Sequence, residues 1–362
     1  MLWLIAIAVV IVWGIGRFYL RGEDLSKFDE PRDPPVVTVE TPSAEHQQVV
    51  DALASYGLGE PEDRKTPRRA RLAEARRRFD DYGTSFELDV AIEPVTADGV
   101  AAEWVMAPGA DPNFRVLYLH GGAFAIGSPR SHRTFTAKFS HMLGASVLAI
   151  DYRLMPEHPR LASVDDTRTA YRWILANGPR GPAEVSKLVV AGDSAGGNLT
   201  LMVVAWARDE GLRPADAVVA MSPATDGTFT SPSLRRNIET DAMLGPTVGR
   251  FAKVPHVAML WMSWLTARRR PCDPSVSPVH GDLSGLPAIL LHASESELLI
   301  DEVRRYANKA RLAGSPVRLE TWPNTMHVWH GFVQTVPEAR EAFTYVAQFL
   351  ANHVDSGAQP PS

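Results

Sequence analysis

The chain has 362 residues, of which 45% are hydrophobic and 22% are charged. This balance is ordinary for a globular protein and excludes a disordered chain, a collagen and a polytopic membrane protein. Lys and Arg number 37 against 42 Asp and Glu, so the formal charge of −5 gives no global reason to bind nucleic acid. The single cysteine, Cys272, excludes an intramolecular disulfide and a thiolate metal site. Any hydrolytic chemistry here would use Ser, His and carboxylates, or a His/carboxylate metal site.

The N-terminal segment is apolar, and residues 2–16 carry no charge. Extended past Arg17 and Tyr19, which suit an interface, the run approaches the roughly 20 residues that cross a bilayer. We therefore predict a single-pass membrane anchor helix over residues 1–21. A cleaved signal peptide is the alternative, but no basic residue precedes the run and no small-x-small cleavage site follows it. Basic residues lie only on its C-terminal side, which favours a cytoplasmic catalytic domain.

Residues 22–95 are interpreted as a linker and N-terminal cap helices. Prolines mark an extended linker, and Thr41, followed by proline, begins a helix that Gly57 ends. A second helix is expected from Thr66 to about Gly83. Its many arginines indicate a solvated face, or contact with anionic headgroups near the anchor.

From residue 115 onward, short apolar runs alternate with helical segments, which indicates an α/β layer fold. Most runs lack polar alternation, as expected of strands buried on both faces of a parallel sheet. The expected strands are 116–119, 147–150, 188–191, 218–221, 288–291 and 317–320, and the expected helices are 165–177, 195–208, 302–313 and 338–352.

A long insertion, residues 223–275, interrupts this alternation and places Trp261 and Trp264 in a helix. We interpret it as part of a cap between two core segments, 96–222 and 276–355. A flexible tail over 356–362 would complete the chain.

The sequence Gly-Asp-Ser-Ala-Gly at 192–196 matches G-x-S-x-G, directly after an apolar strand and before a helix. A tight strand-to-helix turn exposes the hydroxyl of Ser194 and aims the helix N-terminus at it, which favours developing negative charge. We interpret Ser194 as a nucleophile; the alternative is a structural turn.

A second motif, His-Gly-Gly-Ala-Phe at 120–124, follows the strand that ends at Leu119. Consecutive glycines let backbone N–H groups point into one space, which suits an oxyanion. We predict that the amides of Gly121, Gly122 and Ala195 form the oxyanion hole, and that His120 braces this loop.

The two motifs, with Asp-Tyr-Arg-Leu-Met-Pro-Glu-His-Pro at 151–159 between them, closely resemble the hormone-sensitive-lipase-like family of α/β-hydrolases. The resemblance covers roughly residues 100 to 350. It implies a mostly parallel central sheet flanked by helices, and a helical cap built from N-terminal helices and an insertion. It also implies a serine esterase for short- to medium-chain carboxylic esters. Arylacetamide deacetylases are similar, and they too carry an N-terminal anchor.

In this fold the acid and the base follow the serine. The family places its histidine four positions beyond the proline of an aromatic-Pro pair, which is His327 here, after Trp322-Pro323; His330, in His-Gly-Phe, is the alternative. The family pattern acid-x-Leu-x-Asp implies Glu297 as the acid, with Asp301 as the alternative. Glutamate stands here in place of the usual aspartate. Because the role of the acid is to orient the imidazole, the longer side chain can also fill it.

The resemblance thus implies a Ser194–His327–Glu297 triad and an acyl-enzyme intermediate, and we expect no cofactor and no metal. Candidate substrate-pocket residues are Phe124, Asp193, Trp261 and Trp264, although packing within the cap is the other interpretation of the two tryptophans. An amidase, deacetylase or acyltransferase with the same triad remains open, as does a catalytically silent ligand receptor. Expected partners are a small-molecule ester and the membrane, with no nucleic acid; the oligomeric state is open, a dimer being possible.

Overall fold

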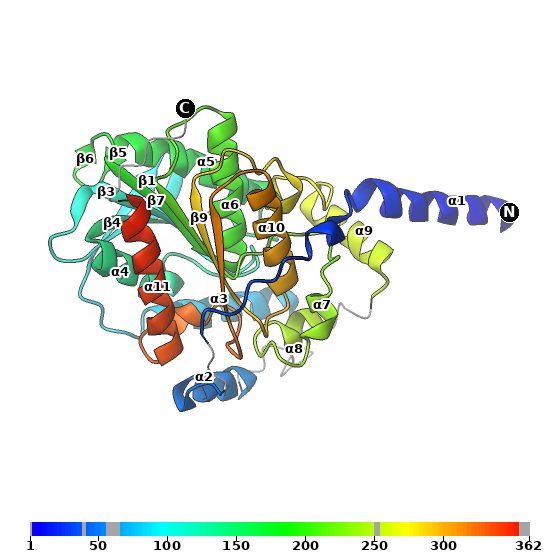
Figure 1. Cartoon of the computed structure of the whole chain (residues 1–362), viewed down its shortest axis with the longest axis horizontal. Coiled ribbons are helices and arrows are strands. Elements are labelled where there is room, and N and C mark those ends of the chain that lie inside the picture. Colours follow the sequence, from blue (N-terminus) through cyan, green and yellow to red (C-terminus); the bar gives the residue numbers. More distant parts are fainter. Residues whose placement is uncertain (1, 38–40, 56–65, 250–253, 355–362) are drawn as a thin grey trace.

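The computed structural model describes residues 2–37, 41–55, 66–249 and 254–354. These residues form an eight-stranded sheet with helices on both faces (Figure 1). The sheet has the order β1-β2-β4-β3-β7-β8-β9-β10. It is parallel from β4 to β10, while β2 runs antiparallel to β4 and to β1. The strands are β1 (Ala91–Ala97), β2 (Val100–Met106), β3 (Asp111–Leu119), β4 (Ala145–Ile150), β7 (Lys187–Asp193), β8 (Ala217–Met221), β9 (Ala288–Ser294) and β10 (Val317–Trp322). The predicted α/β fold with a mostly parallel sheet is confirmed.

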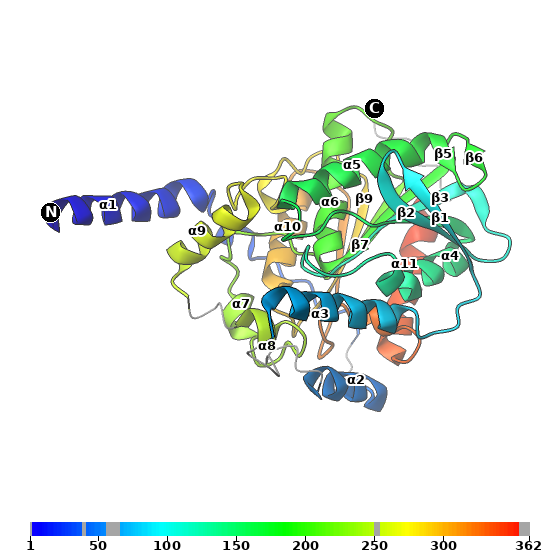
Figure 2. The same cartoon turned by 180° about the vertical axis from the view of Figure 1, so that it is seen from behind.

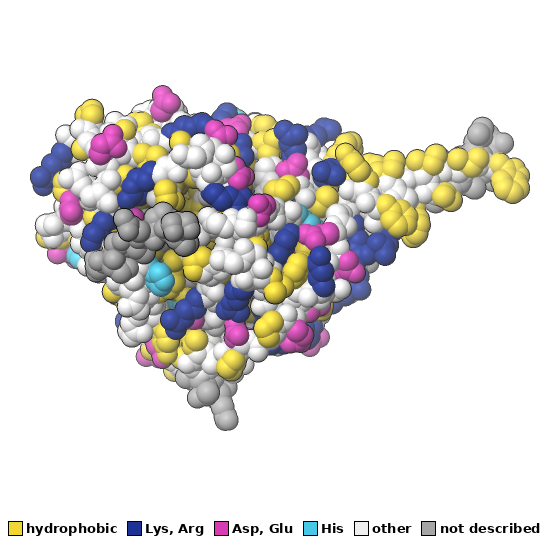
Figure 3. Space-filling view, turned by 45° about the horizontal axis from the view of Figure 1, so that its top comes forward, with side chains coloured by type: hydrophobic (Ala, Val, Ile, Leu, Met, Phe, Trp, Pro, Cys, Tyr) yellow, Lys and Arg dark blue, Asp and Glu magenta, His cyan; other side chains and the backbone are white. Residues whose placement is uncertain are grey.

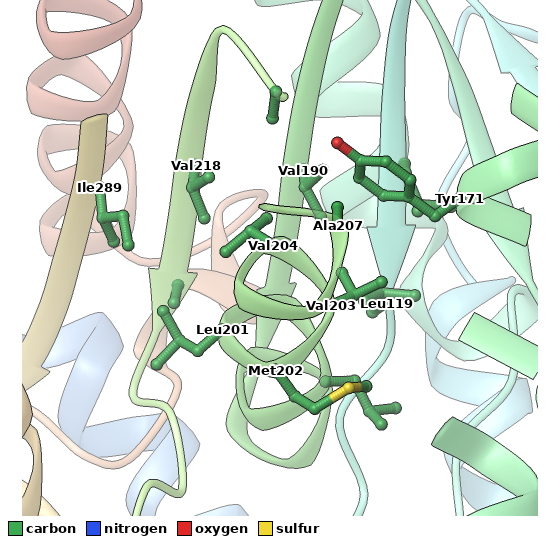
Figure 4. Packing of buried hydrophobic residues seen from close by; sticks show 14 of the residues in the cluster. Leu119, Tyr171, Val190, Leu201, Met202, Val203, Val204, Ala207, Val218 and Ile289 are labelled. Carbon is green, nitrogen blue, oxygen red and sulfur yellow. The ribbon is translucent and has the colours of Figure 1, made fainter. Parts of the chain in front are cut away.

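Side-chain alternation along the central strands builds a hydrophobic core on each face of the sheet. In β3, Val116 and Tyr118 pack in one core, and Leu117 and Leu119 in the other. The first core is covered by α4 (Arg133–Leu143) and α11 (Pro337–Val354), and the second by α5 (Arg160–Ala176), α6 (Ser194–Asp209) and α10 (Ile300–Leu312). Figure 4 shows Leu201, Val203 and Val204 of α6 packed beside strand residues such as Val190 and Val218.

The edge hairpin of β1 and β2 is absent from the expected strands. Its turn is made by Asp98 and Gly99, whose φ angles are +49° and +89°. Positive φ at two central residues is typical of a type I′ hairpin turn, for which Asp-Gly is a preferred sequence. The Asp98-Gly99 dipeptide could therefore have predicted the hairpin of β1 and β2 from the sequence. A second, minor hairpin joins β5 (Asn177–Gly178) to β6 (Gly181–Pro182).

Several helices lie outside the layers of the sheet (Figure 2). They are α2 (Ala44–Ser55), α3 (Arg68–Gly83), α7 (Ser233–Arg236), α8 (Gly245–Val248) and α9 (His256–Ala267). The arginine-rich α3 is anchored to the core by Arg76, which donates to the carbonyls of Ala125 and Met155 at 2.8 and 3.0 Å and pairs with Glu157. The predicted division of the chain into core and cap segments stays a prediction.

The predicted membrane anchor over residues 1–21 is wrong. Among residues 2–37, 41–55, 66–249 and 254–354, no helix combines the length and the apolar composition needed to cross a membrane. Helix α1 (Leu2–Gly14) has 13 residues, about 20 Å of rise against a hydrocarbon core of roughly 30 Å. The next turns, η1 (Ile15–Leu20), form a π-helix that packs on α9: a Cβ at Gly16 would lie 2.7 Å from Val257 Cγ1. The cytoplasmic location of the catalytic domain was inferred from the anchor, so this prediction is withdrawn as well.

The chain that follows is a strap, residues 21–37, along α10 and β10. Its short helix η2 (Leu25–Phe28) buries Leu25 and Phe28 in the core beneath α10. Helix α1 instead projects from the body with exposed apolar side chains (Figure 3). Side chains of α10 hold the strap: Arg305 pairs with Asp29, Asn308 donates to the carbonyls of Phe28 and Pro31, Lys309 pairs with Glu23, and Arg311 pairs with Asp33.

We expect the strap, and not α1, to stabilise the domain. Deleting residues 1–14 should change the free energy of unfolding little, because α1 is mostly exposed. Deleting residues 1–37 should cost about 3–6 kcal/mol, since Leu25 and Phe28 lose their burial. Urea unfolding of the two truncated proteins measures this, with Phe28→Ala, expected to cost about 3–5 kcal/mol, as a point variant. Equal stability of the two truncations would contradict it.

Candidate active site

Ser194 lies in a sharp turn between β7 and α6. Its φ of +50° is the left-handed conformation that an L side chain rarely adopts. The turn is tight because α6 begins directly against the end of β3: a Cβ at Gly196 would overlap the carbonyls of Leu119 and His120. Only glycine fits there, which explains physically why the G-x-S-x-G motif ends in glycine. The strained turn places the Ser194 side chain at the carboxyl edge of the sheet.

The structure brings the three predicted catalytic side chains together. The Ser194 hydroxyl lies 2.9 Å from His327 Nε2, and His327 Nδ1 lies 3.3 Å from Glu297 Oε2. Glu297 is fully buried, whereas His327 is 2% exposed. The arrangement can pass the serine proton to an imidazole that a carboxylate orients.

The alternative base and acid lie elsewhere. His330 Nε2 is 3.0 Å from His292 Nδ1, and His292 Nε2 is 2.9 Å from Glu320, so these side chains form a separate buried chain. Asp301 forms ion pairs with Arg236 and Arg304. Its contacts therefore serve the packing of α10 against the 223–275 segment.

Hydrogen bonds on both sides of His327 hold its loop. The Val328 amide donates to the Ser222 hydroxyl at 3.2 Å, and the Met326 amide donates to His46 Nε2 at 3.1 Å. His46 belongs to α2, far away in sequence, and is buried. The structure thus reveals a support for the loop that no motif in the sequence indicated.

Buried charges control the proton affinity of His327. Its burial disfavours the charged imidazolium, but the hydrogen bond and negative charge of Glu297 outweigh this effect and raise the pKa of His327. The carboxylates of Asp241 and Asp193 add to the rise in this pKa. An imidazolium formed during a reaction is therefore stabilised at this position.

Two of the predicted oxyanion residues, Gly121 and Gly122, lie in a compact loop, residues 120–127, whereas Ala195 lies in α6. At Gly122 φ is +112°, and a Cβ would overlap the Ile126 carbonyl, so glycine is required. The Gly121 amide is 3.1 Å from Asp193 Oδ1 and 3.2 Å from His132 Nε2. Because the Gly121 N–H is engaged there, Gly122 and Ala195 remain as the amides of the predicted oxyanion hole. His120 stacks on Tyr152 with ring centroids 4.1 Å apart, a contact that suits a bracing role.

Asp193 lies behind the 120–127 loop and does not line an open pocket. It is 2% exposed and accepts a hydrogen bond from the Tyr118 hydroxyl at 2.8 Å. Burial alone would raise the pKa of Asp193, but His132 and the Tyr118 hydrogen bond hold the pKa below its ordinary value. Asp193 is therefore an anionic anchor for the loop.

The aromatic pocket candidates have separate surroundings. Trp261 Nε1 donates to the Val12 carbonyl at 3.1 Å, and its ring meets Trp264 edge-on at 5.5 Å. This pair joins α9 to the N-terminal segment. Phe124 ends the predicted oxyanion motif, and its ring lies under the Arg160 guanidinium. Over the described parts of the chain, no cluster of three or more His, Cys, Asp or Glu side chains is arranged to hold a metal ion.

Residues 116–331 match the alpha/beta hydrolase fold family. An acetyl-hydrolase of Streptomyces hygroscopicus is 36% identical over 268 residues, which are 73% of this chain and 83% of that protein. A crystal structure of an esterase from the bacterial hormone-sensitive lipase family is 33% identical, with a TM-score of 0.74, covering 87% of this chain and 99% of that one. The structure of EstE5 soaked with p-nitrophenyl butyrate is also 33% identical, with a TM-score of 0.72, over 86% of this chain and 99% of that one.

The chain belongs to the alpha/beta hydrolase family, in its hormone-sensitive-lipase-like branch. It is a carboxylic ester hydrolase. The family resemblance inferred from the two glycine motifs is confirmed by these matches.

We predict that His46 couples the stability of the domain to pH. Burial lowers the pKa of His46, so its folded pKa lies below the ordinary value of about 6.5. Its contribution to stability is fully present above that value and is lost as the pH falls toward the folded pKa. His46→Gln keeps an acceptor for the Met326 amide but cannot titrate. Between pH 7 and 5 it should lose less stability than the wild type, by up to about 1.4 kcal/mol per pH unit.

Urea unfolding at pH 7, 6 and 5 tests this coupling. His141→Gln is the matched control, because His141 is exposed on α4. Parallel pH profiles for the wild type and His46→Gln would contradict the prediction.

Proposed function

We propose that this ester hydrolase is a serine esterase that uses Ser194 as nucleophile, His327 as general base and Glu297 as the orienting acid. The observation that carries the proposal is the 2.9 Å separation of Ser194 Oγ and His327 Nε2, in a turn that projects the serine. Without a base in reach, a serine hydroxyl is a weak nucleophile.

His327 Nε2 takes the Ser194 proton while Oγ forms a bond to the ester carbonyl carbon. The carbonyl oxygen becomes an oxyanion, which the amides of Gly122 and Ala195 stabilise. His327 then gives its proton to the departing alkoxide, and an acyl-enzyme with the released alcohol results. Water, deprotonated by His327, attacks the acyl-enzyme, and the acid leaves as the serine regains its proton.

The preferred substrates are short- to medium-chain esters. Support comes from the acetyl-hydrolase among the relatives and from the p-nitrophenyl butyrate soaked into EstE5.

Hydrolysis of 4-nitrophenyl esters from acetate to dodecanoate tests this proposal. Ser194→Ala should lower kcat by roughly 10³-fold or more. Ser186→Ala, an exposed serine just before β7, should leave kcat unchanged and serves as the control. Equal rates for the wild type and Ser194→Ala would remove Ser194 from the proposed mechanism. Faster cleavage of 4-nitroacetanilide than of 4-nitrophenyl acetate would indicate an amidase.

The pH profile of kcat/KM should report the raised pKa of His327. Only the neutral imidazole accepts the serine proton, so activity falls as the pH drops through this pKa, at a midpoint above about 6.5. Glu297→Gln removes the charge that raises the pKa of His327. The midpoint should therefore move to lower pH while kcat falls by about 10²- to 10⁴-fold. An unmoved midpoint in Glu297→Gln would remove Glu297 from the proposed triad.

A further inference from the structure

Arg160 is a buried cation beside the proposed active site. It is the first residue of α5 and is 4% exposed. Its guanidinium carbon lies 3.5 Å from the centre of the Phe124 ring, in the loop that carries Gly122. Its Nη2 donates to Asn198 Oδ1 at 2.7 Å, one helical turn beyond Ser194 on α6. The guanidinium therefore adjoins both the predicted oxyanion loop and the helix of the nucleophile.

The positive charge of Arg160 is not balanced by any described carboxylate. Its two hydrogen-bond acceptors, Asn198 Oδ1 and Ser163 Oγ, are both neutral. Burial lowers the pKa of Arg160 to about 10, opposed only by the Tyr152 hydroxyl. Buried charges in proteins are normally paired, because an isolated one loses its hydration without compensation.

Other buried arginines of the described chain show the contrast. Arg304 pairs with Asp301, and Arg305 pairs with Asp29. Arg115, which has no ion pair, donates to the carbonyls of Pro112 and Ile174. Burial lowers the pKa of Arg115, and the nearby carboxylates of Glu184 and Asp111 oppose this lowering. Arg160 has neither an acid nor a set of carbonyls around it.

Part of the guanidinium of Arg160 is also unused. Its two hydrogen bonds come from Nη1 and Nη2, while Nε–H donates to no described residue. Nε is not among the fully enclosed polar atoms without a partner, so it keeps some solvent contact although the residue as a whole is 4% exposed. The Phe124 ring lies against the guanidinium, with its centre 3.5 Å from the guanidinium carbon.

We propose that Arg160 is a specificity-determining residue that binds a free carboxylate on the ester substrate, so that the preferred substrates are esters that carry a carboxylate on the acyl or the alcohol side. The inference rests on the proposed function, since the carboxylate would be held while Ser194 attacks the ester carbonyl. A guanidinium matches the geometry of a carboxylate through paired N–H groups. The bound substrate supplies the negative charge that the surroundings of Arg160 lack.

Two pairs of esters test the proposal, each comparing a carboxylate with a methyl group. Methyl hydrogen succinate and methyl butanoate differ on the acyl side, and butanoyloxyacetate and ethyl butanoate differ on the alcohol side. In at least one pair, Arg160→Met should lower kcat/KM for the charged ester by about 10- to 100-fold, mainly through KM. For the neutral ester the loss should stay below about threefold. Arg160→Lys keeps the charge and should recover part of the loss.

Arg172→Met is the matched control. It removes a guanidinium that lies 4.6 Å from the centre of the Trp206 ring, about 18 Å further along α5. Neither ester of a pair should respond to it. Equal losses for charged and neutral esters in Arg160→Met would show that Arg160 only braces Phe124 and Asn198, which overturns the proposal.

Failure of the substrate proposal and failure of the esterase proposal are distinguishable. Hydrolysis of neutral esters with no Arg160-dependent preference for the charged ones would overturn only the former. Succinate binding gives a readout without turnover: succinate should raise the Tm of the wild type and not that of Arg160→Met. The absence of any rise in the wild type would contradict the carboxylate site.

Discussion

The close approach of α6 to the end of β3 is the constraint on which the site depends. Because Gly196 lies against the carbonyls of Leu119 and His120, the chain between β7 and α6 has no room for a relaxed turn. Ser194 therefore takes a positive φ, and the folding energy of the two buried elements compensates for that strain. The same contact sets the predicted oxyanion loop beside the serine, since that loop is the continuation of β3. The position of Ser194, the proposed nucleophile, and that of the loop thus depend on the same packing contact.

Charge around this turn is arranged in two layers. Glu297 contacts His327 directly, whereas Asp193 lies behind the 120–127 loop and is held anionic by His132 and Tyr118. Both carboxylates raise the pKa of His327, so both stabilise an imidazolium. The Gly121 amide also donates to Asp193, which fixes the loop and leaves Gly122 and Ala195 as the amides of the proposed oxyanion hole.

The sequence was most informative where chemistry and backbone geometry require particular residues. The glycine motifs predicted the fold and family correctly, and the three residues assigned to the triad lie within hydrogen-bonding distance in order, although their roles stay predictions. The anchor prediction failed because apolar composition does not reveal that the helix ends at Gly14 and that η1 packs on α9. His46 and Arg160 were overlooked because each acts through tertiary contacts with residues distant in sequence, which no local pattern records.

The N-terminal residues outside the family match contribute to the site from two directions. His46 of α2 holds the loop of His327 through the Met326 amide, and Arg76 of α3 holds the loop of Gly122 through the Ala125 carbonyl. Each contact fixes a backbone group next to a proposed catalytic group without touching the reacting atoms. A shift of about 1 Å in such groups costs orders of magnitude in rate. Helices α2 and α3 therefore help to fix the positions of the two loops that carry the proposed catalytic groups.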